Sequence, residues 1–215
     1  MQEYDGKILP ASHPHSIMAN RVLQLLTPHA PSYRADWKVH VIKADCQIFA
    51  FTTPGGQIFV FTGILPVCQD DDGLAFILSH EMAHVLARHA EKTVDDGPIK
   101  NAVRKYAPSW ADWSEERARE LEADSIGLMI MSKACFDPEA AVRFWKRVPG
   151  VHKLFLPGKL SGQVVTGPSH PEHLERIENI RGLMDEARKE YENSKCGVTD
   201  SHLLGFQKAR NWLSW

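Results

Sequence analysis

The segment His80-Glu81-Met82-Ala83-His84 constrains this chain more than any other, because it sets two imidazoles and a carboxylate at helical spacing. On a helix, residues four apart lie on one face, so His80 and His84 can present their rings to the same metal ion. Glu81 lies about 100° around that helix, where its carboxylate can reach a water beside the metal without being a ligand. The pattern predicts one zinc ion per chain with a general base next to it.

The flanking residues favour a helix over residues 72–93. Aspartates at 70–72 supply an N-cap and negative charge at the helix N-terminus. Apolar side chains then recur at helical spacing: Leu74, Ile77, Leu78, Met82, Val85 and Leu86. The alternative is a buried amphipathic helix whose two histidines are satisfied without a metal. His89 has no partner at ligand spacing, and we interpret it as a surface histidine.

A catalytic zinc site needs a third protein ligand, and the best donors lie in a second predicted helix over 114–133 with Ser114 as its N-cap. Glu120 and Asp124 share one face of this helix, whereas Glu122 projects to nearly the opposite side. Glu120 is the predicted ligand because of its longer reach. Asp124 is predicted to accept the free N–H of a ligating histidine.

Two alternatives stay open for this acidic helix. Glu116 lies one turn before Glu120 on the same face and is the second candidate ligand. The acidic side chains can also be explained as a solvated face that pairs with Arg117 and Arg119.

Taken in order, these motifs resemble the gluzincin metallopeptidases of the HtpX and CaaX prenyl protease group, and within it the OMA-type endopeptidases of the mitochondrial inner membrane. The resemblance extends over residues 5–190. It rests on five successive segments: residues 54–63, His80-Glu81-x-x-His84, Glu120-x-x-Ala123-Asp124, residues 134–145, and Ser169-His170-Pro171 followed by Arg176. It implies an α+β fold, a mostly helical zincin-type domain with a small β-sheet, a hairpin, beside the zinc helix.

The resemblance also implies roles for individual residues. It implies three zinc ligands and a general base: His80, His84, Glu120 and Glu81. It implies that His170 lies near the scissile carbonyl and that Arg176 organises the site. Ser169-x-x-Glu172 is also a capping box, so the alternative for His170 is simply the start of the helix that follows.

The chain departs from the family pattern at two points. Gln47 stands where such peptidases usually have Asn, which puts any transition-state hydrogen bond from that position in question. OMA-type members carry hydrophobic membrane segments, whereas apolar runs here reach only about half a dozen residues, below the roughly eighteen of a spanning helix. No transit segment is visible at the N-terminus. A soluble cytoplasmic relative and a piece of a longer mitochondrial inner-membrane protein therefore both stay open.

Composition indicates one globular domain over residues 1–215. The chain is 43% hydrophobic and 24% charged, which is ordinary for a soluble fold. A formal net charge of −2 gives no electrostatic case for nucleic-acid binding. The four cysteines are widely spaced without a CxxC pair, and we interpret all of them as reduced thiols: Cys46, Cys68, Cys135 and Cys196.

The hydrophobic pattern divides the domain into successive segments. They are an N-terminal helical segment (1–35), a small sheet (36–63), the zinc helix (72–93), the third-ligand helix (114–133), a C-terminal helix (169–194) and an apolar tail (195–215). Within them we expect a helix at 16–27, a hairpin of strands 47–52 and 57–61, and a helix at 138–148 with Asp137 as N-cap. The polar connection 95–113 is a candidate lid.

The sequence thus predicts a zinc metalloendopeptidase acting on protein or peptide substrates, with mitochondrial protein quality control implied by the resemblance. A noncatalytic, zinc-stabilised binding or chaperone-like module on the same scaffold is the alternative. A third hypothesis is a latent protease that is held inactive by residues 95–113 or by the tail. Peripheral membrane association and oligomeric state stay open.

Overall fold

The computed structural model describes residues 6–30, 35–89, 110–155, 173–194 and 196. Its strands are β1 (Lys38–Ile42), β2 (Ala50–Thr52) and β3 (Gln57–Phe61). Its α-helices are α1 (Pro14–Leu26), α2 (Leu65–Cys68), α3 (Asp71–Leu86), α6 (Trp110–Lys133), α7 (Glu139–Phe155), α8 (His173–Gly182) and α9 (Met184–Asn193). This confirms the predicted mostly helical α+β fold with a small sheet. None of the helices in these ranges is long and apolar enough to cross a bilayer.

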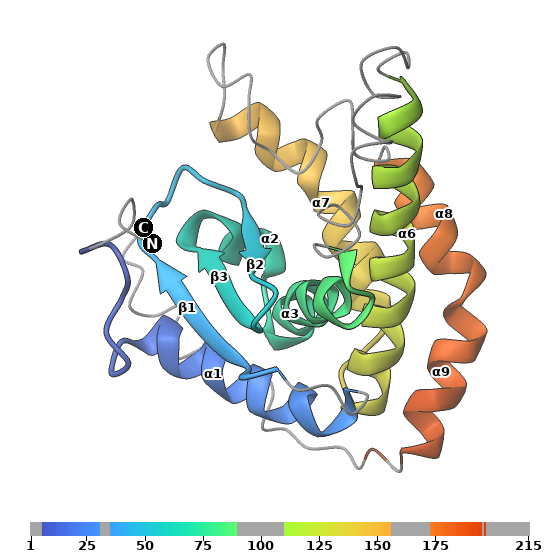
Figure 1. Ribbon diagram of the computed structural model, residues 1–215, viewed down its shortest axis with the longest axis horizontal. Helices are drawn as coiled ribbons and strands as arrows, with labels where there is room; N and C mark the ends of the chain where they lie inside the picture. Colours follow the sequence, from blue (N-terminus) through green and yellow to red (C-terminus); the bar gives the residue numbers. More distant parts are fainter. Residues whose placement is uncertain (1–5, 31–34, 90–109, 156–172, 195, 197–215) are drawn as a thin grey trace, which may run out of the picture.

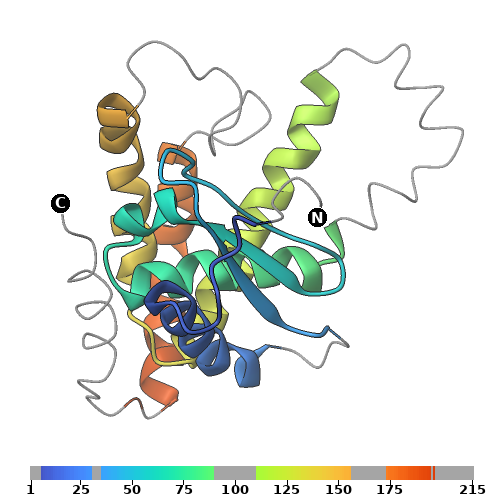
Figure 2. The same ribbon diagram turned by 90° about the vertical axis from the view of Figure 1, so that its left-hand side faces the viewer.

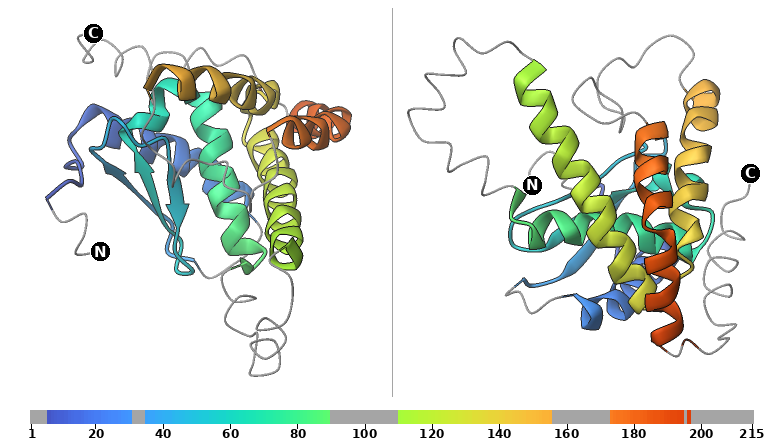
Figure 3. Two further views of the ribbon diagram at one scale, coloured as in Figure 1. Left: turned by 90° about the horizontal axis from the view of Figure 1, so that it is seen from above. Right: turned by 90° about the vertical axis from the view of Figure 1, so that its right-hand side faces the viewer.

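Helix α3 lies at the centre of the molecule, between the sheet and α6 (Figure 1). In Figure 2 the strands cross in front of α3. Seen from above, the sheet, α3, α6 and the pair α8–α9 follow one another as layers, and α7 crosses one end of α3 (Figure 3). Because α3 has neighbours on several sides, nearly all of its side chains are buried. The predicted metal motif is therefore carried by the best-packed helix of the fold.

The sheet has the strand order β1-β3-β2, with β1 parallel and β2 antiparallel to β3. The β2–β3 pair is the predicted hairpin. Gly56 closes its turn by donating to the carbonyl of Thr53, and its φ of +87° is one that glycine adopts without strain. Side chains of β3 alternate, so that Ile58 and Val60 join the main core while Phe59 and Phe61 form a second cluster on the other face. The hairpin thus covers α3 and leaves β2 as an edge strand beside it.

Helix α3 begins as predicted but ends earlier. Asp70 is the N-cap, and its carboxylate accepts from the backbone N–H of Gly73 at 2.7 Å. The expected extension to residue 93 is wrong, because the helix ends at Leu86. Arg88 has a φ of +55°, a left-handed conformation that stops an α-helix and redirects the chain. This turn brings His89 back toward the helix.

Further boundaries differ from the prediction. The first strand of the hairpin begins at Ala50 and not at residue 47. Helix α6 begins at Trp110, so Ser114 lies inside the helix and is not its N-cap. Helix α7 continues through Pro149, where we expected it to end at 148. The helix predicted over 169–194 is two helices that meet at Leu183, with residues 169–172 outside the described ranges. Helix ends are the features that local propensity specifies least well.

The prediction of four reduced thiols is wrong for two of them. Cys135 and Cys196 form a disulfide with 5.2 Å between their Cα atoms. Cys135 follows α6 and Cys196 follows α9, so the bond links the ends of two helices that pack against each other. Cys46 is exposed and Cys68 is buried, both as free thiols. The pairing was missed because connectivity cannot be deduced from cysteine spacing alone.

Gly127 sets the distance between α3 and α6. A Cβ atom at this position would lie 2.9 Å from the backbone nitrogen of His80 and 3.0 Å from the carbonyl carbon of Ser79. Gly127→Ala is therefore expected to reduce the free energy of unfolding by about 1–3 kcal/mol through overpacking, as measured by urea denaturation. Gly182→Ala is the control, because a Cβ there meets nothing within 4 Å. Equal losses for the two variants would show that the α3–α6 contact is not tight.

Candidate metal centre

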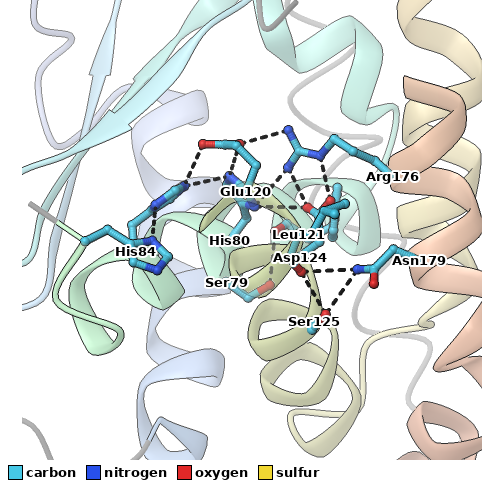
Figure 4. Close-up of polar contacts among 11 residues, drawn as sticks. Ser79, His80, His84, Glu120, Leu121, Asp124, Ser125, Arg176 and Asn179 are labelled. Carbon is cyan, nitrogen blue, oxygen red and sulfur yellow. Dashed lines mark hydrogen bonds and ion pairs between the residues drawn. The ribbon is translucent and has the colours of Figure 1, made fainter. Parts of the chain in front are cut away.

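His80, His84 and Glu120 bring three ligand atoms to one point between α3 and α6 (Figure 4). Nε2 of His80 lies 3.0 Å from Nε2 of His84. The Glu120 carboxylate lies 3.4 Å from each of these two nitrogens, through a different oxygen in each case. The structure therefore groups the three residues that the sequence predicts as ligands.

The spacing of these atoms fits a tetrahedral metal ion. Zinc bonds of about 2.0–2.2 Å to nitrogen and oxygen place neighbouring ligand atoms roughly 3.3–3.6 Å apart in a tetrahedron. The three distances of 3.0, 3.4 and 3.4 Å are close to that range. Two imidazoles with one carboxylate form a donor set that suits divalent transition metals and leaves a position for water. The residues present thus fit a catalytic metal site.

The charges of the cluster residues shift one another's pKa values. Burial lowers the pKa of His80, but hydrogen bonds to Asp124 and Glu120 outweigh it and raise that pKa to about 9. Burial and the neighbouring charge of His80 lower the pKa of His84 to about 3. Burial disfavours the Glu120 carboxylate, yet its hydrogen bond to His80 holds the pKa of Glu120 well below the ordinary value. The Glu120 carboxylate thus stays an anion beside two rings, of which His80 holds a proton more strongly than His84.

Glu81 is buried beside the histidines, with 8% of its surface exposed. Burial raises the pKa of its carboxyl to about 7, and the charge of His80 opposes this shift. A carboxyl with a pKa near neutrality can both accept and donate a proton at little cost. The position of Glu81 therefore suits a general acid–base.

Asp124 holds the far edge of the His80 ring. Its Oδ1 lies 3.1 Å from Nδ1 of His80, on the opposite side of the ring from the cluster of ligand atoms. Asp124 is fully buried, and Arg176 donates to it twice, from Nε to Oδ2 and from Nη2 to Oδ1, each at 2.6 Å. Burial alone would raise the pKa of Asp124, but the charge of Arg176 keeps it below the ordinary value. Asp124 thus stays an anion that can accept the His80 N–H.

Arg176 reaches the cluster from α8 and contacts both carboxylates of α6. Its Nη1 donates to Oε2 of Glu120 at 3.0 Å, so one guanidinium fixes Glu120 and Asp124 together. The guanidinium also lies over the Trp145 ring, 4.0 Å from the ring centroid, and Arg176 is only 1% exposed. Trp145 belongs to the segment 134–145 on which the family resemblance rests, but its contact with Arg176 is not predicted from the sequence. Trp145 lies 31 residues before Arg176 and on another helix, so no local sequence pattern connects the two residues.

Two further side chains anchor α8 to α6 beside the cluster. The Asn179 amide donates to the backbone carbonyl of Leu121 and to the Ser125 hydroxyl, both at 3.1 Å (Figure 4). Neither Asn179 nor Ser125 was predicted as a site residue. Their contacts help to keep Arg176 in reach of the carboxylates.

The remaining predicted residues lie elsewhere. Glu116, the second candidate ligand, is exposed and does not belong to the group of ligand atoms. Gln47 is exposed in the segment before β2. His170, the apolar tail apart from Cys196, and most of the 95–113 connection fall outside the described residues.

The interpretation of His89 as a surface residue is wrong. His89 is 5% exposed and lies between His84 and Glu122. It was missed because its position depends on the left-handed Arg88, which ends α3 and has no sequence signal of its own.

Sequence comparison matches this chain to known metallopeptidases, in agreement with the geometry of the site. The family model described as Peptidase family M48 matches residues 15–103 and 111–184. The chain is 35% identical to mitochondrial metalloendopeptidase OMA1 of Schizosaccharomyces pombe, over 99% of this chain and 66% of that protein. It is 32% identical to the Saccharomyces cerevisiae protein of the same name, over 93% of this chain and 65% of that protein.

More distant relatives share the same region. Metalloendopeptidase OMA1, mitochondrial, of Homo sapiens is 30% identical over 75% of this chain and 35% of that protein. The beta-barrel assembly-enhancing protease of Escherichia coli is 24% identical over 57% of this chain and 30% of that protein. The chain thus spans less than two thirds of the length of the curated relatives it matches.

Proposed function

Because this chain belongs to peptidase family M48, we propose that it is a zinc metalloendopeptidase that hydrolyses peptide bonds of protein substrates. The observation that carries the proposal is the convergence of three ligand atoms, from His80, His84 and Glu120, with Glu81 buried beside them. In this proposal the three side chains hold one zinc ion per chain. The fourth position is left for water.

The proposed chemistry assigns a task to each side chain. Bound zinc supplies a Lewis acid that lowers the pKa of water toward about 7 and polarises a peptide carbonyl. Glu81 takes a proton from the attacking water and delivers it to the leaving amine nitrogen. Asp124 and Arg176 keep the His80 ring and the Glu120 carboxylate in position. His170 is proposed as a helper at the scissile carbonyl on the family resemblance alone.

The names of the fungal and human relatives support a mitochondrial location for this chain. We extend the proposal to association with the inner membrane and to a role in protein quality control. The substrates proposed are proteins or peptides presented in an extended form, since the edge strand β2 lies beside α3 and can pair with a main chain.

Removal of the metal is expected to abolish cleavage of an unfolded protein, and added zinc is expected to restore it at one ion per chain. Zinc at 100 times its dissociation constant should also stabilise the folded protein by about 2.7 kcal/mol, because it binds only the folded site. Thermal denaturation with and without zinc measures this effect. Glu120→Gln is the control and should lose most of the zinc-dependent stabilisation. Cleavage that persists in protein stripped of all metal would overturn the proposal.

A further inference from the structure

His89 contacts the edge of the His84 ring that faces away from the ligand cluster. Nδ1 of His89 lies 2.8 Å from Nδ1 of His84, and the two rings meet edge to face with centroids 5.0 Å apart. Nε2 of His89 lies 3.1 Å from Oε2 of Glu122 on α6. A continuous line of polar contacts therefore runs from His84 through His89 to a carboxylate.

We propose that His89 and Glu122 form a positioning relay that orients His84 and keeps its proton on Nδ1. The inference rests on the proposed zinc function and adds to it the support of the second histidine ligand. His89 is not itself a ligand in this proposal. It contacts Nδ1 of His84, whereas the ligand atoms gather around Nε2.

The direction of each hydrogen bond in the relay follows from the number of protons on the two imidazole rings. Two imidazole nitrogens 2.8 Å apart share one proton, because one must donate and the other accept. His84 can bind a metal through Nε2 only when that nitrogen is unprotonated, so its proton lies on Nδ1. Nδ1 of His89 then accepts, which places the His89 proton on Nε2. From there it is donated to the Glu122 carboxylate, which accepts it.

The two histidines of α3 are then supported in parallel ways. Nδ1 of His80 faces the carboxylate of Asp124 directly, whereas Nδ1 of His84 reaches the carboxylate of Glu122 through His89. The Asp124 side chain is fully buried, while that of Glu122 is 50% exposed. Water screens the Glu122 charge, so we expect His89 to contribute more to the position of His84 than Glu122 does.

Zinc affinity of the full chain, measured by competition with a chromophoric chelator, tests the relay. His89→Leu removes the acceptor for His84 Nδ1–H and is expected to weaken zinc binding about 10–100-fold. His89→Asn retains a side-chain oxygen that can accept this N–H and should recover most of the affinity. Glu122→Gln should weaken binding by a smaller factor. Glu116→Gln, an exposed acid of the same helix, is the matched control and should bind as the wild type does.

A spectroscopic readout separates positioning from general stability. In zinc-loaded protein with ¹⁵N-labelled histidine, nitrogen–proton correlation spectra should show His84 protonated at Nδ1 and unprotonated at Nε2. This measurement needs no folded His89 variant. Wild-type zinc affinity in His89→Leu, or coordination of zinc by His84 through Nδ1, would overturn the relay. Failure of the wild type to bind zinc would overturn the proposed function as well, so the two failures are distinguishable.

Discussion

Glu81→Gln is expected to lower turnover of an unfolded protein substrate by about 100-fold or more, because general acid–base catalysis typically contributes 10²–10⁴ in rate. The amide has nearly the shape of the carboxylate but cannot take a proton from water. Zinc content should stay at one ion per chain, since Glu81 is not among the three grouped ligand residues. Single-turnover cleavage rates and metal analysis of the same preparations measure both quantities.

The matched control for this variant is Glu116→Gln, which makes the same chemical change on an exposed side chain. It should keep wild-type turnover and zinc content. Turnover of Glu81→Gln at the wild-type rate would remove Glu81 from the mechanism. A wild type that binds zinc and cuts no peptide bond would instead favour the noncatalytic, zinc-stabilised module.

Arg176→Met is expected to reduce the free energy of unfolding by about 3–5 kcal/mol, because it removes the guanidinium that pairs with a buried and a mostly buried carboxylate. Arg176 is 1% exposed, and it reaches from α8 to the fully buried Asp124 and to Glu120 on α6. Arg176→Lys should restore little of this loss, since a single ammonium group cannot reproduce the two parallel bonds to Asp124. Urea denaturation of the metal-free protein measures the change without a contribution from zinc.

Arg188→Met supplies the comparison at the surface. Arg188 pairs with Glu139 and Asp185, and its side chain is 55% exposed. Exposed ion pairs of this kind contribute about 0–1 kcal/mol. Equal destabilisation by Arg176→Met and Arg188→Met would show that the buried network does not stabilise the fold.

The elements that the sequence predicts well are those whose signal is local. Helix α3, helix α6 and the β2–β3 hairpin each carry a periodic apolar pattern, and α3 and the hairpin are also bounded by a capping or a turn residue. The sequence does not predict the helix ends that depend on the backbone conformation of a single residue or on tertiary packing. Arg88 turns left-handed after α3, and α7 continues through Pro149 to Phe155. No pattern of residue types specifies either outcome.

The same distinction holds for the metal centre. The spacing of His80 and His84 on one helix is sufficient to predict that they converge. The choice between Glu120 and Glu116 depends on how α6 is placed along α3, which the close contact at Gly127 determines. Such a contact between helices far apart in the sequence has no local signature. His89 was misassigned for the same reason, because its place depends on a turn and on a neighbouring helix.

The anomalous signal at the zinc absorption edge, recorded from crystals of the zinc-loaded protein, tests the central claim most directly. We predict one peak per chain between α3 and α6, about 2.0–2.2 Å from Nε2 of His80, Nε2 of His84 and a carboxylate oxygen of Glu120. A zinc ion held by other side chains, or the absence of a peak at this point, would contradict the assignment of the site.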